Sequence, residues 1–95
     1  MRRLKVNTTR RREVLDLTDR VNALLAEAGF KAGLCHLLLL HTTAALTLAD
    51  LDPGTDLDLL DAFTELVPKL QYRHAHNPAH VPNHILSALI GTSLA

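Results

Sequence analysis

Residues 34–48, LCHLLLLHTTAALTL, decide how this chain is expected to fold. The stretch is apolar on both faces, contains no glycine or proline, and is long enough for either a buried helix or a strand. Its threonines are β-branched, which favours a strand. We therefore predict one long central strand here, or two shorter strands with a bulge near His41.

The residues before this stretch predict a hairpin and a helix. Apolar and polar residues alternate over 4–8, Arg10–Arg12 provide a turn, and 14–17 are again extended. Apolar side chains then recur at helical spacing through residues 18–28, and Gly29 stands where a helix commonly ends.

The residues after the stretch predict two more helices. A turn at 52–54 leads into a helix over 55–67, which is stopped by a proline. Residues 69–82 are expected to form a loop, and 83–90 a last helix that is capped by Asn83 or Val81 and ended by a glycine. Residues 92–95 begin another extended segment.

Length and composition restrict the class of protein. The 95 residues are 47% hydrophobic and 21% charged, which is typical of a single globular domain. Ten basic and ten acidic residues cancel, so no global field attracts nucleic acid. No apolar run is long enough to span a membrane, the N-terminus lacks the apolar region of a signal peptide, and Cys35 is the only cysteine. We therefore predict a cytoplasmic protein without nucleic-acid or membrane partners, supported by a metal, further subunits or further chain.

Four of the six histidines, His74, His76, His80 and His84, lie close together in the sequence. Imidazole is a good ligand for zinc and related metals. His80 and His84 have the spacing that places two ligands on one helical face, but Pro82 lies between them and disfavours that arrangement. From spacing alone, a metal site and a solvent-exposed histidine-rich loop are about equally favoured.

His41 stands within an apolar run and is therefore expected to be buried with a hydrogen-bonding partner. By itself it is best interpreted as a core histidine; together with the later histidines, it becomes a candidate for a shared site. The start of the helix at 83–90 offers backbone N–H groups for an anion, and His84, Ser87 and Gly91 lie along one of its faces. Cys35 is interpreted as a structural thiol.

Three ordered motifs resemble the YjbQ-like family, whose members are often labelled secondary thiamine-phosphate synthase. They are residues 33–48 followed by Asp52-Pro53, then Tyr72-x-His74, then the run PNHILSALIGTSL at 82–94. The resemblance extends over essentially the whole chain. It implies a single α+β domain over 1–95, with a sandwich-like antiparallel sheet and about three helices, assembled as a homotrimer. Because relatives continue through further strands, we expect this chain to lack the C-terminal strands of the family.

The resemblance also implies a reaction and a site. The expected reaction joins a pyrimidine pyrophosphate to a thiazole phosphate and releases pyrophosphate. The alternatives are a non-catalytic trimeric metal- or phosphate-binding protein and a metal-dependent phosphoester hydrolase. The site would lie between subunits and use a divalent metal, zinc or magnesium. The expected roles are catalysis by His41 and His84, binding of a small phosphorylated substrate by Thr43, Asn83 and Ser87, and metal ligation by His41, His74 and His84.

Overall fold

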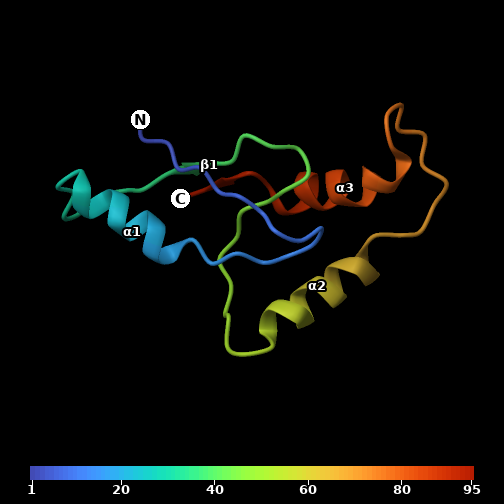
Figure 1. The fold of residues 1–95 in the computed structure, drawn as a ribbon, viewed down its shortest axis with the longest axis horizontal. Helices are drawn as coiled ribbons and strands as arrows, with labels where there is room; N and C mark the ends of the chain where they lie inside the picture. The colour runs from blue at the N-terminus through green and yellow to red at the C-terminus, as the bar shows by residue number, and fades with distance from the viewer.

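Three α-helices and one short antiparallel sheet make up the computed structural model, which describes all residues 1–95 (Figure 1). The predicted α+β class, with antiparallel pairing and three helices, is therefore confirmed. The longest helix has 12 residues, and none is long and apolar enough to cross a membrane. In chain order, the elements are α1 (Thr18–Glu27), β1 (Leu37–Leu38), α2 (Thr55–Leu66), the 3₁₀ turn η1 (Pro78–His80), α3 (Val81–Ile90) and β2 (Ser93–Leu94).

The sheet brings the middle of the chain against its end. Leu37 pairs with Leu94 and Leu38 with Ser93. The pairing continues beyond the strands, because the Leu39 N–H donates to the Thr92 carbonyl at 2.8 Å. Burial alternates along 34–40, with the odd-numbered residues from 35 to 39 half-buried and the even-numbered residues exposed. This period of two is the one expected of a strand.

The predicted long strand over 34–48 is wrong in its length, because regular pairing ends soon after Leu39. The chain bends at Thr42–Thr43, where the Thr43 N–H donates to the Nδ1 atom of His41 at 3.1 Å. A backbone donor that bonds a neighbouring side chain is withdrawn from the ladder. The predicted break near His41 is therefore present as a bend, and a second sheet that would complete a sandwich is absent.

The predicted opening hairpin is also wrong. Residues 1–17 contain no strand, although a bend does form at 10–12. The loop is held by side chains instead: the Thr9 N–H donates to Glu13 at 2.8 Å, and Arg12 donates to Thr64 on α2 at 2.8 Å. Alternating polarity indicates one face for burial but supplies no partner strand, and a strand requires one.

The helices lie close to their predicted positions. α1 and α2 begin at Thr18 and Thr55, within the predicted ranges, and α3 begins at Val81, the earlier of the two residues predicted to cap it. The earlier start is possible because Pro82 falls in the first turn, where a proline needs no N–H partner. η1 runs directly into α3 and is itself capped by Asn77, whose side chain accepts from the Ala79 N–H at 3.0 Å.

The fold has little buried core. Val67 and Ser87 are the only buried residues, each 5% exposed, and the radius of gyration is 15.3 Å, against roughly 12–13 Å for a compact domain of this length. Leu66 at the end of α2 and Leu89 near the end of α3 are 70% and 72% exposed. Specific hydrogen bonds therefore carry much of the connection between distant segments.

Candidate functional site

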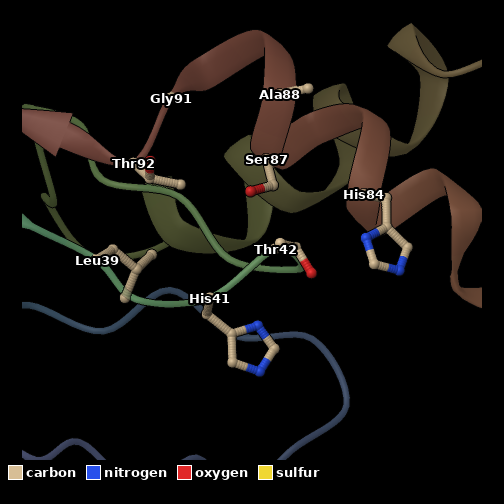
Figure 2. Close-up of a pocket in the computed structure, with 8 residues that line it drawn as sticks. All are labelled: Leu39, His41, Thr42, His84, Ser87, Ala88, Gly91 and Thr92. Atoms are coloured by element: carbon tan, nitrogen blue, oxygen red, sulfur yellow. The ribbon is translucent and has the colours of Figure 1, made fainter.

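A pocket of about 450 Å³ lies between α3 and the segment that follows β1 (Figure 2). Its size falls within the range of small-molecule sites, roughly 300–1,000 Å³. One wall comes from the bend after β1 and the other from the C-terminal half of α3 and the turn into β2. The lining residues are Leu39, His41, Thr42, His84, Ser87, Ala88, Gly91 and Thr92.

Hydrogen bonds between distant residues hold the two walls together. The buried Ser87 hydroxyl donates to the Ala44 carbonyl at 2.6 Å, and the Leu46 N–H donates to the Gly91 carbonyl at 3.0 Å. Together with the Leu39–Thr92 bond, these two hydrogen bonds hold residues 39–46 along the end of α3. The shape of the pocket therefore depends on this small set of bonds.

Gly91 makes the turn from α3 into β2. Its φ of 101° and ψ of 164° fall in a region that only glycine occupies readily. A Cβ at this position would meet nothing within 4 Å, so the constraint comes from the backbone and not from crowding. The turn directs Thr92 toward Leu39 and closes one end of the pocket.

The lining combines polar and apolar groups and contains no carboxylate. Two imidazoles and the hydroxyls of Thr42 and Thr92 are available, and the Thr92 N–H makes no hydrogen bond within the chain. By contrast, the single hydroxyl proton of Ser87 is already donated to Ala44. Ser87 therefore holds the wall of the pocket, and its hydroxyl is not a free donor for an anion.

The two predicted catalytic histidines lie on opposite walls of this pocket. His84 is half-buried and hangs from α3 beside Thr42, whereas His41 is exposed and its ring extends away from α3 (Figure 2). The expectation that His41 is a buried core histidine is therefore wrong, because the bend carries its ring to the outer edge of the pocket. Their catalytic roles stay predictions.

The loop histidines approach the start of α3. The ring centroids of His74 and His84 are 5.0 Å apart in an edge-to-face contact, and those of His74 and His76 are 5.9 Å apart. The structure thus brings together two of the three predicted metal ligands, with His41 on the other wall. No group of three histidine, cysteine or carboxylate side chains in this chain could hold a metal ion. Within one chain, the arrangement does not fit the predicted zinc or magnesium.

The predicted anion site at the start of α3 is also only partly available. η1 supplies acceptors for the incoming N–H groups: His80 donates to the Asn77 carbonyl at 3.1 Å, and Val81 donates to the Pro78 carbonyl. Asn83 is half-buried, and neither Asn83 nor Thr43 lines the pocket; the Thr43 hydroxyl lies 2.8 Å from His41 Nδ1. The free backbone donor lies instead in the turn after the helix, at Thr92.

Sequence reasoning missed Thr42, Thr92 and the apolar residues Leu39 and Ala88 as lining residues. Thr42 follows His41 directly, and Thr92 follows Gly91 directly, so both stand beside residues that the sequence did indicate. No local pattern indicates Leu39 or Ala88, because their meeting depends on the pairing of residues 39 and 92.

Comparisons with known proteins agree with the resemblance. The family described as UPF0047 protein YjbQ-like matches residues 2–95. UPF0047 protein Mb2586c of Mycobacterium bovis is 38% identical over 93 residues, which cover 96% of this chain and 70% of that protein. UPF0047 protein YugU of Bacillus subtilis is 32% identical over 94 residues, covering 98% of this chain and 71% of that protein. No solved structure matches the chain at a significant level.

These relatives correct the predicted reaction. They carry the name of an uncharacterised family, and thiamine-phosphate synthase is the name of a different family, so the prediction of that activity is wrong. A label that is often given to members of a family does not establish the reaction of that family. The match over residues 2–95 and the identity to the mycobacterial protein establish that the chain belongs to the YjbQ-like family of UPF0047 proteins.

Proposed function

We propose that the pocket between α3 and the bend after β1 binds a small molecule that carries phosphate or a similar oxyanion. The observation that supports this proposal is the lining: two histidines, two threonines and a backbone N–H without a partner in the chain belong to residues around one pocket, and no carboxylate is among them. Such groups donate hydrogen bonds, and donors without acidic neighbours favour an anion over a cation.

Both walls of the pocket supply groups for contact with a ligand. On the α3 side, His84 stands at the level of Thr42, and Thr92 lies at the opposite end of the hollow (Figure 2). Leu39 and Ala88 supply the apolar part of the lining. A volume of about 450 Å³ exceeds what a bare phosphate needs, so the ligand is proposed to carry an organic group that contacts these two side chains.

The proposal is tested by titrating the full chain with inorganic phosphate and following backbone amide signals by NMR. We expect the signals of Thr42, His84 and Thr92 to shift together along one binding curve. His84→Ala should weaken phosphate binding by about 10- to 100-fold, because a hydrogen bond to a charged group contributes roughly 1.5–3 kcal/mol.

His80→Ala is the matched control for that substitution. It also removes one imidazole near the start of α3, but His80 is exposed and does not line the pocket. Its phosphate affinity should equal that of the parent protein. Equal losses in the two variants, or shifts spread over the surface of the parent, would show that the pocket is not the site.

The divalent metal and the homotrimer stay predictions from the family resemblance. The phosphate titration is therefore run with and without a chelator. Binding that survives the chelator belongs to the side chains and backbone of the pocket, and binding that is lost with the chelator requires a metal ion.

A further inference from the structure

One ring nitrogen of His41, Nδ1, already forms hydrogen bonds within the chain. The Thr43 backbone N–H lies 3.1 Å from Nδ1, and the Thr43 hydroxyl oxygen lies 2.8 Å from the same atom. The hydroxyl can donate or accept, but the backbone N–H can only donate. Nδ1 therefore carries its lone pair toward Thr43, and the backbone donor decides between the two tautomers.

The other ring nitrogen must then carry the proton. A neutral imidazole has one N–H and one lone pair, so a lone pair at Nδ1 places the N–H at Nε2. Nε2 makes no hydrogen bond within the chain, and the side chain is exposed. Figure 2 shows one ring nitrogen directed back toward the bend and the other directed away from α3.

We propose that Thr43 holds His41 in the Nε2–H tautomer, so that His41 presents a hydrogen-bond donor and not a metal-binding lone pair at the outer edge of the pocket. This inference rests on the proposed function for the identity of the ligand, which is an oxyanion, but not for the tautomer itself. In this arrangement His41 donates a hydrogen bond to an anion and does not ligate the predicted metal. Thr43 is then a positioning residue, because it acts through the His41 ring.

The predicted metal does not fit this side chain. A metal ion binds an imidazole through a lone pair, and the only lone pair of this tautomer is shared by the two Thr43 donors. A metal on Nε2 would require the ring proton to move to Nδ1, where it would face the Thr43 N–H. The contacts of His74 lead to His84 and His76 and do not include His41.

The tautomer is measured on the full chain without ligand, by two-bond ¹⁵N–¹H correlation spectra of protein labelled with [¹⁵N]histidine. His41→Gln assigns the His41 signals by their disappearance. We expect a protonated-type shift for Nε2 and a lone-pair-type shift for Nδ1. Signals that show Nδ1–H as the major form would overturn the proposal.

Two variants of Thr43 separate positioning from folding. Thr43→Val keeps the β-branched shape and the backbone N–H but loses the hydroxyl, so the preference for the Nε2–H tautomer should weaken without being lost, and the two ring nitrogens should move part of the way toward averaged shifts. Thr43→Ser keeps a hydroxyl and should restore the parent shifts. If Thr43→Val leaves the His41 shifts unchanged, the hydroxyl has no part in setting the tautomer. The claim that the Thr43 hydroxyl helps to hold the Nε2–H form would then be overturned.

Titration with zinc and with inorganic phosphate tests the consequence for ligands. Phosphate should leave Nε2 protonated and move its signal, and His41→Ala should lower phosphate affinity by about twofold to tenfold. Zinc that deprotonates Nε2 at stoichiometric concentration would overturn the donor assignment. Absence of phosphate binding together with an Nε2–H signal would overturn the proposed function and leave the tautomer standing, so the two failures are distinguishable.

Discussion

Replacing Ser87 with alanine tests whether one buried hydrogen bond holds the pocket walls together. Ser87 is 5% exposed, and its hydroxyl donates at 2.6 Å to the carbonyl of Ala44, which lies 43 residues away in the sequence. The substitution removes one oxygen, leaves the helix with a better helix former, and leaves the Ala44 carbonyl without this donor. Few other changes in this chain remove a long-range contact so selectively.

The expected loss of stability follows from the surroundings of the two partners. An intramolecular hydrogen bond contributes about 0.5–1.5 kcal/mol to the net stability of the fold. If its loss leaves a buried acceptor without water or another donor, the cost in stability rises to roughly 1–3 kcal/mol. Ala44 belongs to an exposed part of the bend, so water can reach its carbonyl after the substitution. We therefore expect a loss of about 1 kcal/mol, or roughly 4–8 °C in Tm for a domain of this size.

Urea unfolding followed by circular dichroism measures the change, with Ser93→Ala as the matched control. Ser93 also bonds across the chain, to His36 Nε2 at 2.5 Å, but both residues are exposed. Its loss should cost less than about 0.5 kcal/mol. If Ser87→Ala is as stable as Ser93→Ala, and phosphate still binds with parental affinity, the reasoning that this bond shapes the pocket is refuted.

Three further predictions test other features of the structure. Gly91→Ala should lose about 1–3 kcal/mol in urea unfolding through backbone strain alone, and parental stability would show that the turn tolerates a side chain. Hydrogen bonds from Thr18, first from its side chain and then from its backbone, hold the pKa of the Asp16 carboxyl below its ordinary 3.8. The stabilisation from Asp16 is therefore present above pH 3.8 and lost as pH falls through the folded-state pKa; a carboxyl ¹³C titration with a midpoint at or above 3.8 would contradict this. The homotrimer implied by the resemblance predicts a light-scattering mass three times the chain's 10.4 kDa, and a monomeric mass would refute it.

Helix positions were predictable from the sequence because their signals are local. The apolar spacing after Thr18 and the turn before Thr55 predicted the starts of α1 and α2, which the structure confirms. The start of α3 at Val81 was one of two predicted cap positions, but the 3₁₀ turn before it was not predicted, because that turn depends on the Asn77 cap rather than on apolar spacing. Strands were predicted less well, because alternation at Leu4–Thr8 shows which face is apolar but not which segment pairs with it.

The residues of the candidate site were likewise predictable only where the signal is local. His41 and His84 could be selected from residue type and position, and the structure places both on one pocket. The bond from Ser87 to Ala44 could not be predicted, because no local pattern indicates a partner 43 residues away. Leu39 and Ala88 could not be selected at all.

By itself, the sequence determined the α+β class, the three helices, the family and the choice of histidines and hydroxyls as the chemistry-bearing side chains. These depend on short-range spacing and residue type. Only the tertiary structure decided that residues 39–46 lie along the end of α3, that Ser87 donates to a backbone carbonyl, and that Thr43 faces Nδ1 of His41. The physical reason is that a hydrogen bond commits a particular donor to a particular acceptor. Which ring nitrogen or hydroxyl remains free for a ligand is known only once the chain has brought its partner within about 3 Å.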